Sequence, residues 1–176
     1  LEEVVDAGKK HNIPVVVDAA SMLPPVSNLH RFTDMGVDIV CFSGGKAIQG
    51  PNNTGMMLGN GKGAAIIKAV RDHSFPHNGW GRGHKISKEQ IVGLCVALEE
   101  FVKHGDSFYE RQTKIAEYFV RELEQIKGLT VSIIPNDDTY HEHVSMPHVP
   151  RVKIEWDKGT MGFSGADLDA YMAKED

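Results

Sequence analysis

Two ionisable side chains stand just beyond short apolar runs, where they could act on a small molecule. Asp18 directly follows Val15-Val16-Val17, a β-branched run typical of a strand covered on both faces. Lys46 follows a second apolar run, residues 37–42, after a turn containing two glycines. An amine can form a Schiff base with an aldehyde, and a carboxylate can hold a proton on an aromatic ring nitrogen.

Asp18 and Lys46 are therefore the pair that a pyridoxal phosphate site requires. The lysine would carry the cofactor aldehyde and later move protons at the substrate Cα, while the aspartate would keep the pyridine nitrogen protonated. Each residue alone has an ordinary interpretation, Asp18 as a turn former and Lys46 as a solvated side chain. Their shared position beyond the carboxyl ends of strands favours a site, because ligands collect there in open α/β sheets.

The elements around this pair follow from apolar periodicity. A helix starts at residue 1 and must end before Pro14, and Asn28 is placed to cap a short helix that ends at Gly36. Strands are expected over residues 15–17, 37–42 and 55–59, and a helix over residues 62–72. Buried strands joined through a short helix predict an α/β fold with a mainly parallel sheet and right-handed crossovers.

The second half of the chain predicts a change of architecture. Residues 75–84 form a glycine-rich candidate binding loop, and Arg82 and Lys85 are candidate ligands for a substrate carboxylate or phosphate. Ser87 and Gln90 form a capping-box pattern that starts a helix running to Gly105.

A further helix is expected over residues 106–127, and the alternating pattern of residues 129–133 and 152–156 then predicts a half-exposed antiparallel sheet. We thus expect the carboxyl-terminal part of a large cofactor-binding domain over residues 1–105, a connecting helix over 106–127, and the start of a small α+β domain over 128–176.

Composition bounds the class of protein. The chain has 176 residues, 41% of them hydrophobic and 24% charged, as expected for a globular chain that buries a core. The net charge of −5 argues against nucleic acid as a partner. Neither a membrane span nor a signal pattern is evident, so we expect a cytoplasmic protein with Cys41 and Cys95 buried, reduced and structural. Both ends of the sequence have the pattern of cut helices.

Residues 15–21 and 42–55 together resemble the fold-type-I pyridoxal phosphate enzymes. The resemblance is to the group related to L-seryl-tRNA(Sec) selenium transferase and D-glucosaminate-6-phosphate ammonia-lyase. It implies Lys46 as the internal-aldimine lysine and Asp18 as the partner of the pyridine nitrogen. It also implies Ala20 against the cofactor ring and Ser43 at the cofactor phosphate.

The resemblance further implies α,β-elimination on an amino acid or amino sugar acid, in a homodimer or larger homo-oligomer. The alternative within the group is the β-replacement reaction of the selenium transferase type. The family also has an N-terminal stretch with a phosphate-binding helix start and a ring-stacking residue, and neither is in this sequence.

Two other interpretations remain open at this point, a nucleotide-binding domain and an inactive remnant, while a metal site is not expected. Residues 59–64 fit the dinucleotide-binding pattern Gly-x-Gly-x-x-Ala, yet no acidic residue stands where the ribose partner is expected. His141, His143 and His148 lie close together but lack a recognised metal spacing, so no metal is expected. The chain could also be an inactive structural remnant of such an enzyme.

Overall fold

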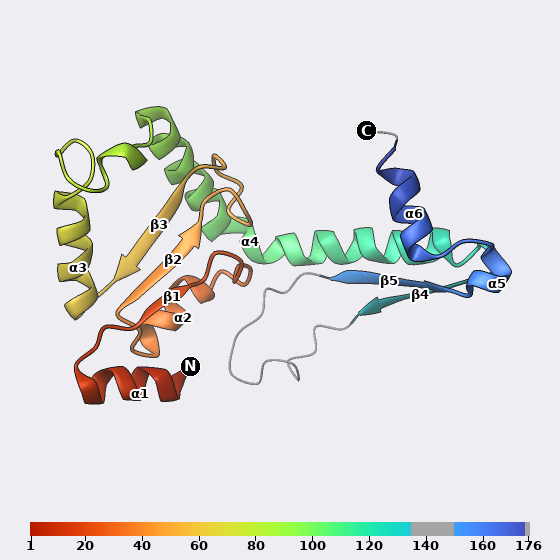
Figure 1. The fold of residues 1–176 in the computed structure, drawn as a ribbon, viewed down its shortest axis with the longest axis horizontal. Helices are drawn as coiled ribbons and strands as arrows, with labels where there is room; N and C mark the ends of the chain where they lie inside the picture. The colour runs from red at the N-terminus through yellow and green to blue at the C-terminus, as the bar shows by residue number, and fades with distance from the viewer. Residues whose placement is uncertain (135–149, 175–176) are drawn as a thin grey trace. The chain divides into compact units, whose positions relative to one another are not determined.

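The computed structural model describes residues 1–134 and 150–174 of the chain (Figure 1). Contacts divide these residues into two compact units, one of residues 1–109 and the other of residues 110–134 and 150–174. The first unit contains a three-stranded sheet and the second a two-stranded sheet. None of the described helices is both long enough and apolar enough to cross a lipid bilayer.

The first unit alternates helices and strands in chain order. It consists of α1 (Glu2–His11), β1 (Val16–Asp18), α2 (Asn28–Asp34), β2 (Ile39–Ser43), β3 (Gly55–Gly59), α3 (Gly61–Asp72), a 3-10 turn at Arg82–His84 and the first half of α4 (Lys88–Leu123). The second unit consists of the remainder of α4, then β4 (Leu129–Ile134), β5 (Arg151–Trp156), α5 (Lys158–Met161) and α6 (Gly165–Met172). The predicted strands and helices are thus present with shifts of a few residues at their ends, except that the two helices expected on either side of Gly105 are one helix.

The sheet of the first unit has the order β1-β2-β3. Strands β1 and β2 are parallel, with Asp18 opposite Cys41, while β3 is antiparallel to β2 with Gly55 opposite Ser43. Residues 44–54 connect β2 to β3 without a helix, and so short a link reverses the chain instead of crossing back over the sheet. The described sheet is therefore mixed, with one parallel and one antiparallel pairing.

One face of this sheet builds the core. Val40 and Phe42 of β2 point into it, and the Phe32 ring of α2 lies 6.3 Å from the Phe42 ring between centroids. Leu94 and Phe101 of α4 cover the same face. Burial of these large apolar side chains is the main source of stability for the unit.

The opposite face of the sheet is covered at one end by α3, as Figure 1 shows. Helix α3 approaches closely at Gly63, where an added Cβ would lie 1.7 Å from the Asp38 carbonyl oxygen. On the same face Val16, which pairs with Ile39 at the α3 end, is 58% exposed, and Met57, which pairs with Cys41, is 39% exposed. Asp18, at the carboxyl end of β1, is exposed as well.

Helix α4 corrects the predicted division at residue 105. The sequence pattern indicated two helices, but one helix runs from Lys88 to Leu123. Gly105 lies inside it, and an added Cβ there would be 2.7 Å from both Val26 and Phe101 side-chain carbons. The glycine accommodates a tight tertiary contact and does not end the helix.

Two smaller predictions also differ from the structure. Ser27, and not Asn28, is the residue before α2, and Asn28 is fully buried with its Nδ2 donating to the Met22 carbonyl oxygen at 2.7 Å. Cys95 is exposed on α4, whereas Cys41 is half-buried, and both are free thiols.

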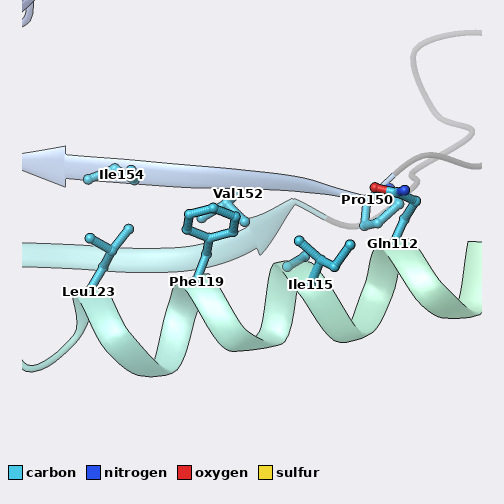
Figure 2. Close-up of a pocket in the computed structure, with 8 residues that line it drawn as sticks. Gln112, Ile115, Phe119, Leu123, Pro150, Val152 and Ile154 are labelled. Atoms are coloured by element: carbon cyan, nitrogen blue, oxygen red, sulfur yellow. The ribbon is translucent and has the colours of Figure 1, made fainter.

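The second unit forms an apolar groove of about 340 Å³ between α4 and the β4–β5 hairpin (Figure 2). Its lining is almost entirely apolar: Gln112, Ile115, Ala116, Phe119, Leu123, Pro150, Val152 and Ile154. Among residues 1–134 and 150–174, no titratable side chain lines this groove.

Candidate active site at the carboxyl edge of the sheet

The turn after β1 is organised by the carboxylate of Asp18. Asp18 Oδ1 accepts a hydrogen bond from the Ala20 backbone N–H at 3.0 Å, a local closure that aspartate commonly makes after a strand. The Ala19 N–H donates to the Cys41 carbonyl oxygen at 2.9 Å and the Met22 N–H donates to the Ala19 carbonyl oxygen at 3.0 Å. These bonds fix the backbone of residues 18–22 against the end of β2.

The turn that carries Lys46 is held just as firmly. The Gly44 N–H donates to the Thr54 carbonyl oxygen at 2.9 Å, and the Gly44 carbonyl oxygen accepts from the Gly50 N–H at 2.7 Å. An added Cβ at Gly44 would lie 2.2 Å from Thr54 Oγ1, and one at Gly45 would lie 2.5 Å from the Asn52 Cα. Lack of space, more than backbone rotation, therefore accounts for the two glycines.

Helix α4 supports this turn from outside. The predicted capping box is confirmed, since the Ser87 N–H donates to Gln90 Oε1 at 2.8 Å and the Gln90 N–H donates to Ser87 Oγ at 3.2 Å. Gln90 Nε2 also donates to Asn53 Oδ1 at 2.9 Å, and Leu94 packs over Gly44 and Gly50. The start of the helix and the lysine turn are thus one packed assembly.

The Lys46 amine reaches across to the turn after Asp18. Its Nζ donates a hydrogen bond to Ser21 Oγ at 2.7 Å, joining two side chains that are 25 positions apart in the sequence. Ser21 lies three residues beyond Asp18, so the amine, the hydroxyl and the carboxylate belong to the same sheet edge. Ser21 was not predicted from the sequence, because an isolated hydroxyl after a strand has no distinctive pattern.

The other predicted cofactor ligands belong to the same region. Ser43 is half-buried, and since it follows Cys41 by two residues in β2, alternation places it on the sheet face shared by Asp18 and Cys41. Ala20 is half-buried in the Asp18 turn. Burial, and secondly the negative charge of Asp18, raise the pKa of the Cys41 thiol on this face.

Arg82 and Lys85 form a separate group in the 75–85 loop. The Arg82 guanidinium carbon lies 4.8 Å and the Lys85 Nζ 5.9 Å from the centroid of the Phe75 ring. In the part of the chain that the structure describes, neither residue is hydrogen-bonded to Asp18 or Lys46. Trp80 of the same loop is 96% exposed and does not pin the loop to the core.

The glycines of residues 59–64 have a packing role. They join β3 to α3, where Gly61 adopts a positive φ of 50° and Gly63 allows close contact with β2. Because β3 runs antiparallel to β2, this strand–turn–helix lacks the parallel pairing of a dinucleotide-binding unit. His141, His143 and His148 lie outside the described residues, and the described residues hold no cluster of three potential metal ligands.

The groups at this sheet edge fit the chemistry of pyridoxal phosphate. Asp18 has Oδ1 engaged by the Ala20 N–H, while Oδ2 accepts no hydrogen bond from the described residues and is available to a protonated ring nitrogen. The Lys46 amine is exposed on the neighbouring turn, and Ser43 is a hydroxyl donor on the same face as the carboxylate. An amine, a carboxylate and a hydroxyl are the donor set that an aromatic aldehyde with a phosphate would use.

Comparison with known proteins gives a consistent picture. The sequence profile of the DegT/DnrJ/EryC1/StrS aminotransferase family matches residues 1–161. The chain is 33% identical over 173 residues to the D-glucosaminate-6-phosphate ammonia lyase of Salmonella typhimurium (strain 14028s / SGSC 2262), covering 98% of this chain and 41% of that protein. It is 30% identical over 177 residues to the 5'-C-glycyluridine monooxygenase-decarboxylase of a Streptomyces species, covering 98% and 39%.

Among solved structures, the chain is similar to cystathionine gamma-lyase from Lactobacillus plantarum complexed with L-serine. The TM-score is 0.57 at 14% identity, covering 90% of this chain and 40% of that one. The fold-type-I class predicted from the sequence is therefore confirmed. The chain spans about two fifths of the length of the curated relatives it matches.

Proposed function

Because the chain belongs to the DegT/DnrJ/EryC1/StrS aminotransferase family of pyridoxal phosphate enzymes, we propose that it supplies the lysine-bearing part of such an enzyme. The reaction we propose is α,β-elimination of the ammonia-lyase type on an amino acid or amino sugar acid. The observation that carries the proposal is the hydrogen bond from Lys46 Nζ to Ser21 Oγ, which brings the amine to the turn built by the Asp18 carboxylate.

Each residue has a distinct task in this proposal. When bound, the cofactor supplies a pyridinium ring that withdraws the electrons left when a bond at the substrate Cα breaks. Lys46 would hold the cofactor covalently and, once released, would take the proton from the substrate Cα. Asp18 would keep the ring nitrogen protonated. Ala20 would lie against the ring, and Ser43 would donate to the phosphate.

Arg82 and Lys85 are the residues we propose for the substrate anion. A guanidinium presents a planar pair of donors to a carboxylate or phosphate, and Lys85 adds a second positive charge in the same loop. Both cations lie over one ring, that of Phe75, which restricts their positions.

Elimination is preferred over the replacement reaction of the selenium transferase type for two reasons. The relative with the higher identity of the two is named as an ammonia lyase. The net charge of −5 also disfavours a tRNA substrate. We also propose that residues 1–109 belong to the large cofactor-binding domain and that the second unit begins the small domain, in a homodimer or larger homo-oligomer.

The proposal is tested by asking whether borohydride reduction attaches the cofactor covalently to a single lysine. The purified chain is mixed with pyridoxal 5'-phosphate, its visible absorption is recorded, and borohydride reduction is followed by peptide mapping. We expect the label at Lys46, and its loss in Lys46→Arg, whereas Lys62→Arg, which removes an exposed lysine at the start of α3, retains it. Absence of label, or label spread evenly over the surface lysines, would show that the chain is a structural remnant.

A further inference from the structure

The backbone of Ser21 is fixed relative to that of Lys46. Ser21 is the fourth residue of the turn whose hydrogen bonds run from Ala20 to Asp18 and from Met22 to Ala19, and Ala19 is fully buried. Lys46 stands on the turn closed by the bond between Gly44 and Gly50. Both turns are joined through the β1–β2 pairing. The distance that the lysine side chain must span is therefore set by the sheet.

The side chains themselves are free to move. Ser21 and Lys46 are both exposed, and a lysine has four rotatable side-chain bonds, so the amine could sample many positions in water. The 2.7 Å hydrogen bond to Ser21 Oγ selects one of them, on the Asp18 turn. A serine hydroxyl can accept from an ammonium and can donate to a neutral amine, so it can hold the lysine in either protonation state.

We propose that Ser21 is a positioning residue that holds the Lys46 amine at the Asp18 turn whenever the lysine is not bonded to the cofactor. This inference rests on the proposed function, and it assigns Ser21 two moments of action. Before the cofactor binds, the hydroxyl places the amine where the aldehyde arrives. After the substrate displaces the lysine, the hydroxyl keeps the amine near the Cα proton that it must take.

The test compares Ser21→Ala, which removes the hydroxyl, with Ser21→Thr, which retains it. Ser27→Ala is the matched control, because Ser27 is an exposed serine six residues away whose side chain does not cap α2. In the first measurement, without cofactor, brief reductive methylation with formaldehyde is followed by mass spectrometry of each lysine peptide. We expect Ser21→Ala to raise Lys46 methylation roughly two- to fivefold, because the amine no longer has to break a hydrogen bond.

The second measurement uses pyridoxal 5'-phosphate and borohydride, as above. Here we expect the opposite sign: Ser21→Ala lowers fixation at Lys46 roughly threefold or more, since the amine is no longer held where the aldehyde docks. Ser21→Thr should behave as wild type in both measurements. If Ser21 had only a structural role, Ser21→Ala would raise the methylation of several lysines together. Ser21→Thr would then not restore wild-type methylation at Lys46 in particular.

The two proposals fail in different ways. If wild-type Lys46 is fixed selectively but Ser21→Ala is fixed equally well, the positioning role of Ser21 is overturned and the cofactor assignment stands. If wild-type Lys46 is not fixed above the other lysines, the cofactor assignment fails, and Ser21 loses its proposed role with it. Unchanged methylation of Lys46 in Ser21→Ala would likewise overturn the inference.

Discussion

At the scale of single residues, Asp18 and Cys41 are neighbours, and the negative charge of Asp18 acts on the Cys41 thiol. They are opposite each other in the parallel β1–β2 pair, and in such a register both side chains point to the same face. Burial, and to a smaller extent the Asp18 charge, disfavour the Cys41 thiolate. The pKa of the Cys41 thiol therefore lies above its ordinary value. Cys41 is therefore a built-in probe of the Asp18 carboxylate.

Replacing Asp18 by Asn should lower the pKa of the Cys41 thiol, since the negative charge is removed while an oxygen remains for the Ala20 N–H. More thiolate is then present at about pH 8.5, and we expect iodoacetamide to alkylate Cys41 roughly two- to fivefold faster. Cys95, an exposed thiol, is the internal reference and should react unchanged. At a pH well above the Cys41 pKa of both the wild type and the variant, the two proteins should be alkylated at the same rate. A gain shared by both cysteines would instead indicate partial unfolding.

The sequence predicted some of these residues and missed others for physical reasons. Asp18 and Lys46 could be singled out because each follows an apolar run, and the end of a strand is visible in hydrophobicity. Ser21 was not, because its hydrogen bond is with a residue 25 positions away. The burial expected for Cys95 was wrong, since apolar neighbours in the sequence do not reveal which face of a helix meets the core.

At the scale of elements, the lysine turn depends on close packing between residues 44–54 and α4. Gly44 has Thr54 on one side and the Leu94 side chain on the other. Neither neighbour can move freely, because the Thr54 hydroxyl donates to the Pro51 carbonyl oxygen at 2.6 Å and Leu94 is buried in the core. The turn should therefore tolerate no added side chain at this position.

We expect Gly44→Ala to reduce the free energy of unfolding by about 1–3 kcal/mol, the usual cost of forcing extra atoms into a packed site. Gly83→Ala is the control, because an added Cβ at Gly83 meets no atom within 4 Å, and its effect should stay within about 0.5 kcal/mol. Urea denaturation followed by circular dichroism measures both. Equal stability of the two variants would contradict the packing argument.

The start of α4 gives a second prediction at this scale. Ser87→Ala removes the hydroxyl that accepts from the Gln90 N–H and should cost about 1 kcal/mol of unfolding free energy. Ser87→Thr retains a capping hydroxyl and should cost less. The same urea titration measures the unfolding free energy of both variants. A Ser87→Ala variant as stable as wild type would show that the capping box does not contribute to stability.

The elements also show where local pattern fails. The capping box at Ser87 is local chemistry and was predicted correctly. The expected helix end at Gly105 was wrong, because a glycine has the same low helix propensity whether it ends a helix or makes room for Val26. The direction of β3 was not predicted, since apolar runs do not encode strand direction and only the short helix-free link to β2 fixes it.

At the scale of the whole molecule, the first unit exposes several large apolar side chains. Trp80 is 96%, Ile13 63%, Val92 62% and Val16 58% exposed. We propose that Trp80, the most exposed of these groups, meets a second subunit in the homo-oligomer that the family resemblance implies.

We expect sedimentation velocity to find discrete species at or above twice the monomer mass of 19.4 kDa, in proportions that depend on concentration. Trp80→Ser should shift the distribution toward the monomer if this residue is at the contact. His77→Ser, which removes an exposed ring from the same loop without removing an apolar group, is the control. A single monomeric species at all concentrations would contradict the prediction.

The two tryptophans of the chain divide its fluorescence between the two units. Trp80 is in water already, whereas Trp156 is half-buried, with its indole N–H donating to the Phe163 carbonyl oxygen at 2.9 Å. Denaturant should therefore red-shift the emission of Trp156 and leave that of Trp80 nearly constant, while iodide should quench Trp80 first. A spectroscopist can thus watch the hairpin unit melt in the intact chain without attaching a dye.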